Sequence, residues 1–371
     1  MSFADILSLY RKADLDRRFA AVPSGEVERA VAADRRGPEE LLALLSPAAG
    51  PFLEPMAQRA HEATLRFFGR TIQIYAPIYV SDFCENSCIY CGFNAQNRIR
   101  RRRLSLEEVD REAACLSASG VRHILLLTGE SRKMSPAGYL RDCISVLKGY
   151  FSAVAIEVYP LSESEYADLV SAGADGLTIY QETYDEARYE AVHPAGPKRD
   201  FRFRLDAPER GARGGMRQVS IGALLGLSDF WRTEAFLTGL HARYLQDRYP
   251  DVEIGVSLPR LRPHAGSCAT ASAVTDRNMV QILLALRLFL PRLGIFVSTR
   301  ESPRFRENLV PLGITRMSAG SSTRVGGYTM PVDPGMAPQF EIADHRSVAE
   351  IVAVIREKGY DPVMKDWTML A

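Results

Sequence analysis

The sequence lacks any hydrophobic stretch long enough to cross a membrane, and it lacks a large excess of charge of either sign. No run approaches the ~18–20 uninterrupted apolar residues that a spanning helix needs. Lys and Arg number 46 against 45 Asp and Glu, a net charge of +1, so nothing indicates a nucleic-acid or anionic-membrane partner. The first residues carry an acid and no apolar core before a small-residue cleavage site. We therefore expect no secretory signal and a cytoplasmic protein.

Cysteine is scarce as well, with six in 371 residues, and disulfides are not expected in a cytoplasmic chain of this size. Three of the six are crowded into the segment SDFCENSCIYCGFN, as Cys84, Cys88 and Cys91. Of the others, two lie in amphipathic helical patterns and are expected to be buried, and the third lies in a loop and its role stays open (Cys115, Cys143 and Cys268).

From residue 72 onward, short β-rich runs alternate with helical stretches. About eight such repeats predict an α/β fold in which a parallel sheet closes into a (β/α)8 TIM-type barrel. An open doubly wound sheet is the alternative, because sequence does not show closure. The division predicted is an N-terminal helical extension (1–71), the barrel (72–345) and a C-terminal helix and tail (346–371). The expected strands are 73–80, 123–129, 153–159, 176–180, 219–227, 253–259, 294–299 and 314–320.

Local signals place some helix starts and one long connection. Ser105 with Glu108 three residues later is typical of a capping box, and Pro136 is expected at the first position of the next helix. The polar, glycine-rich segment 194–215 is predicted to be a long connection over the barrel mouth.

The spacing Cys84-x3-Cys88-x2-Cys91 directly follows the first expected strand, in the position where barrel enzymes place their active sites. Three thiolates on one short loop can bind a [4Fe–4S] cluster and leave one iron open to an external ligand. The alternative is a structural zinc site with three cysteines and one histidine. Zinc motifs usually draw on two separated pairs of ligands, and no histidine lies near this loop, so the cluster is favoured.

These residues resemble the radical S-adenosylmethionine superfamily motif C-x3-C-x-aromatic-C, with Tyr90 as the aromatic residue. The resemblance implies one [4Fe–4S] cluster and S-adenosylmethionine as cofactors. The segment LLLTGES is similar to the superfamily's Gly-Gly-Glu segment, which holds the methionine amine. Thr128 replaces the first glycine, so only Gly129 and Glu130 carry over.

The resemblance covers nearly the whole chain and is closest to the ThiH family of 2-iminoacetate synthases, which are tyrosine lyases. It is carried by IYQETYDEARYEAVHP, VSIGALLGLSDF, STRESPRFRENLVPLGITRMSAGSSTRVGGY and PVMKDW. It implies that Glu182 and Arg204 contact S-adenosylmethionine, with the arginine pairing with its carboxylate. Ordinary surface salt bridges are the alternative for both residues.

Substrate residues are expected on the later strands. Arg300 follows the seventh expected strand and Ser318 ends the eighth, where the resemblance assigns them to the substrate carboxylate. Ser321 is a further candidate, although it could simply form a turn. The basic run 98–103 could meet a phosphate or an electron donor, but a solvated segment before a helix is favoured.

The resemblance implies cleavage of the Cα–Cβ bond of L-tyrosine to 2-iminoacetate (dehydroglycine) and 4-cresol, for the thiazole ring of thiamine. It also implies the thiazole synthase ThiG as protein partner and a flavodoxin- or ferredoxin-type reductant. No cysteine follows Cys268, so the second cluster of the related hydrogenase-maturation lyase HydG is not expected. A lyase for another amino acid such as tryptophan, or a zinc-stabilised barrel scaffold without a redox role, remains open.

Overall fold

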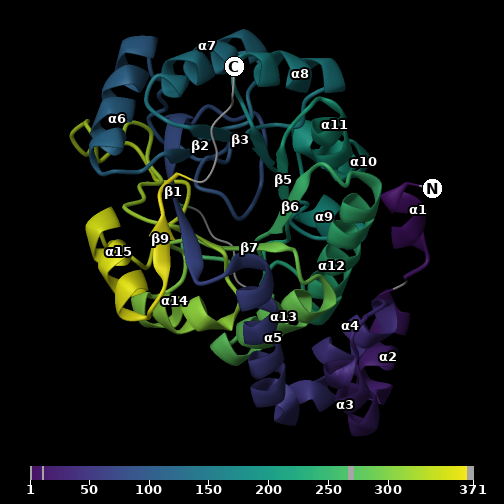
Figure 1. The fold of residues 1–371 in the computed structure, drawn as a ribbon. Helices are drawn as coiled ribbons and strands as arrows, with labels where there is room; N and C mark the ends of the chain where they lie inside the picture. The colour runs from purple at the N-terminus through teal and green to yellow at the C-terminus, as the bar shows by residue number, and fades with distance from the viewer. Residues whose placement is uncertain (1, 11, 266–270, 366–371) are drawn as a thin grey trace.

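In the computed structural model, which describes residues 2–10, 12–265 and 271–365, parallel strands form a closed barrel with helices around it (Figure 1). Strands β2 to β8 pair in sequence order, and β1 closes the ring by pairing with both β8 and β2. The predicted closed barrel is confirmed, and the open doubly wound sheet is wrong. The barrel strands are β1 (Thr71–Ser81), β2 (His123–Thr128), β3 (Ala153–Glu157), β4 (Gly176–Thr178), β5 (Gln218–Ile221), β6 (Glu253–Val256), β7 (Gly294–Val297) and β8 (Arg316–Ser318).

Helices between the strands cover the outside of the barrel, as Figure 1 shows. Their apolar sides are buried against the strands, whose own residues are buried on both faces, as expected for a parallel sheet. These helices are α6 (Leu106–Ala118), α7 (Ala137–Lys148), α8 (Glu163–Ser171), α9 (Glu186–Val192), α10 (Phe201–Leu205), α11 (Ala207–Arg213), α12 (Trp231–Arg248), α13 (Asp276–Phe289) and α14 (Pro303–Leu309).

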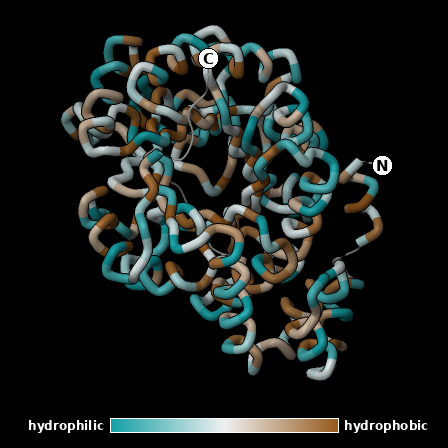
Figure 2. Tube along the Cα trace, in the orientation of Figure 1, coloured by the Kyte–Doolittle hydropathy of each residue, from teal (hydrophilic) through white to brown (hydrophobic). Residues whose placement is uncertain are grey.

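The helices before the barrel pack beside α12 and α13 (Figure 1). These helices carry both hydrophobic and hydrophilic residues (Figure 2). Residues 41–45 are all buried. The Gln281 side-chain amide of α13 donates hydrogen bonds to the carbonyl oxygens of Leu44 (2.9 Å) and Ser46 (2.8 Å), which fixes the end of α4 to the barrel. The N-terminal helices are α1 (Phe3–Ser8), α2 (Lys12–Ala21), α3 (Ser24–Ala32), α4 (Pro38–Leu45) and α5 (Leu53–Phe68).

Of the local expectations, some are confirmed and others are corrected. The capping box at α6 is present, since Ser105 and Glu108 exchange hydrogen bonds of 2.8 and 3.3 Å, but Pro136 caps α7 rather than entering it. The strand expected over 219–227 ends at Ile221. The predicted C-terminal helix is α15 (Val348–Glu357), and a strand that was not predicted, β9 (Asp361–Val363), pairs with the start of β1.

The segment 194–215 connects β4 to β5 as expected, but it is largely helical rather than an open loop. It contains a short 3-10 helix (Pro197–Arg199) followed by α10 and α11, and it buries Lys198 and Arg204. Within the described residues, no helix is both long enough and apolar enough to cross a membrane.

An ion pair with no solvent exposure holds the segment after β8 against α14. The Arg306 guanidinium pairs with the Asp344 carboxylate and also donates to the carbonyl oxygen of Ser318, while Arg346 pairs with Asp344 at 2.7 Å. Because removal of one partner leaves the other charge buried and unpaired, this network is costly to break.

Replacement of Asp344 should therefore destabilise the fold strongly. We expect Asp344→Asn to lower the free energy of unfolding by about 3–5 kcal/mol, measured by urea denaturation. The control Asp247→Asn breaks the exposed pair between Arg243 and Asp247 and should cost under about 1 kcal/mol. Equal effects of the two substitutions would contradict this account of the Arg306–Asp344 pair.

Candidate functional site

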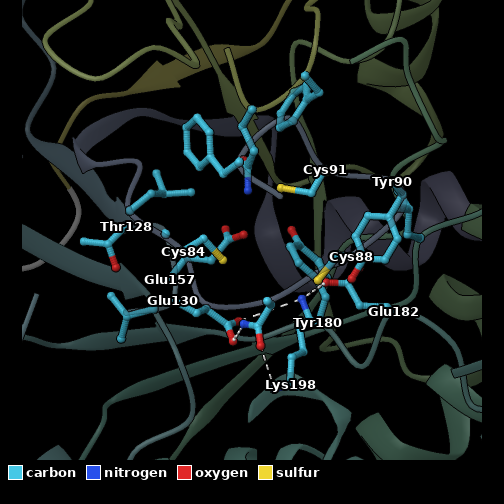
Figure 3. A pocket seen from close by; sticks show the side chains of 18 of the residues that line it. Cys84, Cys88, Tyr90, Cys91, Thr128, Glu130, Glu157, Tyr180, Glu182 and Lys198 are labelled. Carbon is cyan, nitrogen blue, oxygen red and sulfur yellow. Dashed lines mark hydrogen bonds and ion pairs between the residues drawn. The ribbon is translucent and has the colours of Figure 1, made fainter. Parts of the chain in front are cut away.

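The cysteine segment forms a loop between β1 and α6, at the C-terminal end of the barrel. Cys84, Cys88 and Cys91 all line one cavity (Figure 3). Backbone hydrogen bonds attach the loop to the connections after two other strands: Glu85 N–H donates to Glu130 O (3.0 Å), and Ile89 N–H donates to Val192 O (3.2 Å). The loop is thus fixed by its neighbours.

The three sulfur atoms surround the cavity rather than meeting at one point, as Figure 3 shows. Within the described part of the chain, no three His, Cys, Asp or Glu side chains lie close enough to share a single metal ion. A [4Fe–4S] cluster is a larger group whose ligands are thiolates, so separated thiols around a cavity fit it.

Burial raises the pKa of all three thiols, for Cys91 to about 12. Without a cation the thiols are therefore protonated at neutral pH. Bound iron would replace these protons, because metal ligation requires thiolates.

Arg101, from the basic run 98–103, braces the cysteine loop. Its guanidinium donates to the carbonyl oxygens of Asp82 (2.6 Å), Phe93 (2.9 Å) and Asn94 (2.6 Å). At least this residue of the run has a structural role that differs from the solvated segment we expected.

Gly129 lies where the loop after β2 touches the cysteine loop. Its N–H donates to Ser81 O at 2.7 Å, and a Cβ atom at this position would stand 2.4 Å from Phe83 O. Only glycine allows the two backbones to approach so closely. Gly129 therefore sets the distance between the cysteines and the residue that follows it, Glu130.

Four charged side chains form a largely buried cluster beside the cysteines: Glu130, Glu182, Lys198 and Arg204. Arg204 Nη1 lies 2.9 Å from Glu130 Oε1, and Lys198 Nζ lies 2.8 Å from Glu182 Oε1. Arg204 Nε also donates to the carbonyl oxygen of Tyr180 at 2.6 Å. The alternative of surface salt bridges is wrong, because all of these pairs lie in the interior.

Opposite charges govern the ionisation of this cluster. Burial alone would raise the pKa of Glu130 and of Glu182, but the Arg204 and Lys198 cations outweigh it, so both pKa values are lowered. Both carboxylates are therefore ionised at neutral pH. Glu182 also has a φ of 71°, the only positive φ of a non-glycine residue in the part of the chain that the structure describes. Backbone strain of this kind is typical of functional sites.

Tyr90, the aromatic residue of the cysteine motif, lines the same cavity and is buried. Its hydroxyl lies 2.6 Å from His193 Nε2, while His193 Nδ1 lies 2.8 Å from Tyr189 O. Burial lowers the pKa of His193 to about 2, so the ring is neutral. With its proton on Nδ1, directed at the carbonyl, its Nε2 accepts a hydrogen bond from Tyr90.

A second cavity shares a wall with the first and is lined by the candidate substrate residues Arg300, Ser318 and Ser321. The Arg300 guanidinium stacks 3.4 Å from the centre of the Phe340 ring. Ser318 Oγ accepts a hydrogen bond of 3.0 Å from Thr299 N–H. Among the described residues, the buried Ser321 hydroxyl has no hydrogen-bond partner. The structure thus brings all three residues to one cavity.

Sequence reasoning missed several residues that line these cavities. Glu157 ends β3 and Tyr180 closely follows β4, and their place at strand ends was a signal that could have found them. Lys198 was hidden in a segment that was interpreted as an open connection. Of the scattered cysteines, Cys143 is buried as expected, but Cys115 is exposed, and Cys268 lies outside the described residues.

The sequence matches two protein-family models and is similar to known enzymes over nearly its whole length. The model of the radical SAM superfamily matches residues 78–237, and the model of the Biotin and Thiamin Synthesis associated domain matches residues 257–361. The 2-iminoacetate synthase of Escherichia coli (strain K12) is 41% identical over 354 residues, which cover 95% of this chain and 93% of that relative. The 2-iminoacetate synthase of Salmonella typhimurium is 40% identical over the same shares of both chains.

Two solved structures are similar to this chain over nearly its whole length. A crystal structure of HydG, a maturase of the [FeFe]-hydrogenase, superposes with a TM-score of 0.88 at 32% identity, covering 95% of this chain and 79% of that one. HydG from Carboxydothermus hydrogenoformans gives a TM-score of 0.83 at 30% identity, covering 98% of this chain and 83% of that one.

The close backbone contact at Gly129 can be tested directly. We expect Gly129→Ala to lower the free energy of unfolding by about 1–3 kcal/mol and to reduce the iron retained after anaerobic reconstitution, because the added methyl forces the two loops apart. The measurements are urea denaturation and iron analysis.

Gly138→Ala in α7 is the matched control, since its Cβ would meet no atom within 4 Å. It should leave iron content unchanged and stability equal or slightly higher. Normal iron content and stability in Gly129→Ala would show that the contact does not constrain the loop.

Proposed function

Because the chain belongs to the 2-iminoacetate synthase family of the radical SAM superfamily, we propose that it cleaves the Cα–Cβ bond of L-tyrosine to 2-iminoacetate and 4-cresol. The observation that carries this proposal is the cavity in which the three cysteines adjoin a second chamber containing an arginine suited to an amino-acid carboxylate. The alignment over nearly the full length of the relatives supports it.

Cys84, Cys88 and Cys91 would each bind one iron of a [4Fe–4S] cluster, and the fourth iron would bind the amine and carboxylate of S-adenosylmethionine. When bound, these cofactors supply a 5′-deoxyadenosyl radical that removes a hydrogen atom from the tyrosine amino group. Tyr90, the aromatic residue of the motif, and Gly129 line the same cavity and would form part of the wall around the nucleotide.

The buried charge cluster would position S-adenosylmethionine. Glu130 is the candidate for its amine, and Arg204, with Glu182 beside it, is the candidate for its carboxylate. Arg204 is paired with Glu130 in the structure, so binding would require that pair to open or to share its hydrogen bonds with the ligand. A planar guanidinium can bind two carboxylates through separate N–H groups, which makes sharing feasible.

Arg300 would bind the tyrosine carboxylate, with hydroxyl groups from Ser318 and Ser321 beside it. The Arg300 guanidinium forms no ion pair with another described residue, so its charge is available to a ligand. The closed barrel would keep water and stray hydrogen donors away from the reacting atoms.

2-Iminoacetate hydrolyses readily, so direct transfer to the thiazole synthase ThiG is proposed, with a flavodoxin- or ferredoxin-type protein as electron donor. The tail predicted as a docking surface is partly integrated into the fold, since β9 pairs with β1. Residues from 366 onward lie outside the described part of the chain.

The proposed function is tested by anaerobic turnover with S-adenosylmethionine, dithionite and single amino acids. L-Tyrosine should give 5′-deoxyadenosine and 4-cresol together. Cleavage of tryptophan or another amino acid without cresol would favour the rival lyase. Metal analysis that finds zinc in place of iron and sulfide would favour the zinc-stabilised barrel scaffold without a redox role.

Loss of one cluster ligand should abolish the reaction. We expect Cys84→Ala to retain under about a tenth of the iron-dependent visible absorbance and no measurable cresol formation, because two thiolates hold the cluster poorly. Cys115→Ala changes an exposed cysteine on α6 and should behave like the wild type. Full activity in Cys84→Ala would exclude the proposed cluster.

Replacement of Arg300 should weaken substrate binding. We expect Arg300→Lys to raise KM for L-tyrosine by about 10- to 100-fold, since a lysine cannot donate two parallel hydrogen bonds to the carboxylate. KM is measured from initial rates of cresol formation. Arg304→Lys, at an exposed position of α14, is the control and should leave KM unchanged. An unchanged KM in Arg300→Lys would remove this residue from the substrate site.

A further inference from the structure

Three carboxylates line the cavity that contains the cysteines, and they differ in their partners. Glu130 and Glu182 are each paired with a buried cation. Glu157 forms no hydrogen bond or ion pair through its side chain with any residue that the structure describes, although it is mostly buried. Partial burial of a carboxylate without a partner is unfavourable, so its position on the cavity wall calls for an explanation.

Glu157 lies between the two cavities. It is the last residue of β3, and its side chain contributes to the walls of both the cavity with the cysteines and the cavity with Ser318 (Figure 3). Arg300 also lines both cavities. These two residues therefore face the space in which a substrate would meet the cofactors.

The barrel topology places Glu157 and Arg300 on opposite sides of this space. Glu157 ends β3 and Arg300 follows β7, and these strands are separated by three others in either direction around the closed ring. One side chain ends in a carboxyl group and the other in a guanidinium, yet they do not form an ion pair with one another. The gap between them is bounded by an acidic group on one side and a cation on the other.

The surroundings of Glu157 favour a cation beside it. Burial and the Glu182 carboxylate raise the pKa of Glu157 to about 7, against the opposing effects of Arg300, Lys198 and Arg204. A positive charge brought next to this carboxylate would replace the solvation that burial removes. The phenols of Tyr75, Tyr79 and Tyr180 also lie near this carboxyl group and are neutral at physiological pH.

We propose that Glu157 binds the α-ammonium group of the amino-acid substrate while Arg300 binds its α-carboxylate. The inference rests on the proposed function and extends it, since it assigns the recognition of the amino group. The ammonium and carboxylate groups of an α-amino acid are complementary to the carboxyl group of Glu157 and the guanidinium of Arg300. Glu157 also borders the cavity with the cysteines, so the contact would direct the amino nitrogen toward the side of the site where the cofactors would bind.

The test compares two ligands that differ only in the amino group: L-tyrosine and 3-(4-hydroxyphenyl)propanoate. Their dissociation constants are measured calorimetrically on anaerobically reconstituted enzyme with S-adenosylmethionine and without reductant, so that no turnover occurs. The wild type should bind L-tyrosine at least about 10-fold more tightly than the analogue.

In Glu157→Gln, affinity for L-tyrosine should fall by about 10-fold or more, while affinity for the analogue stays within about twofold of the wild type. Retained binding of the analogue also shows that the variant is folded. Glu157→Asp keeps the charge and should keep part of the preference. Glu357→Gln, at the exposed end of α15, should match the wild type for both ligands.

Two results would overturn the proposal: an unchanged preference for L-tyrosine in Glu157→Gln, or an equal loss of affinity for both ligands. The second result would mean that Glu157 supports the shape of the cavity. Cresol formation by the same wild-type preparation, once dithionite is added, separates the two levels. If the wild type forms cresol and the preference is unchanged, only this inference fails. If the wild type forms none, the proposed function fails with it.

Discussion

The candidate site depends on a buried group of two carboxylates and two cations. Glu130, Glu182, Lys198 and Arg204 come from the ends of two strands and from the connection between β4 and β5, and each charge is compensated by another. Desolvation makes such a group costly, so it persists only when every member is satisfied. It therefore ties these segments to one another next to the cysteine loop.

This arrangement explains how a loop can provide a precise site. Asn86, in the cysteine loop, donates from Nδ2 to Glu130 Oε2 at 2.9 Å and accepts at Oδ1 from Lys198 N–H at 2.8 Å. The loop is thereby attached to the charge cluster on one side and, through the contact of Gly129 with Phe83, to β2 on another. Polar groups fixed in advance inside a closed barrel can stabilise charge without reorganising.

The parts of this structure that sequence could predict are those encoded locally. The spacing of Cys84, Cys88 and Cys91 and the alternation of strands and helices are continuous patterns, and residues just after strands, such as Arg300, must lie at the barrel mouth. Lys198 could not be found in this way, because its partner Asn86 lies 112 residues away and Glu182 precedes it on another element. Strand β9 has three residues and little apolar pattern of its own. Cys115 directly precedes Leu116, which is on the buried side of α6, but is itself exposed.

The central claim is that three cysteine thiolates hold a [4Fe–4S] cluster whose remaining iron is open to S-adenosylmethionine. Electron paramagnetic resonance of the anaerobically reconstituted, reduced enzyme tests it most directly, with spectra recorded before and after S-adenosylmethionine is added. The account predicts a signal of a reduced [4Fe–4S] cluster whose g-values change when the ligand binds. A cluster signal that is indifferent to S-adenosylmethionine, or the absence of any cluster signal, would contradict it.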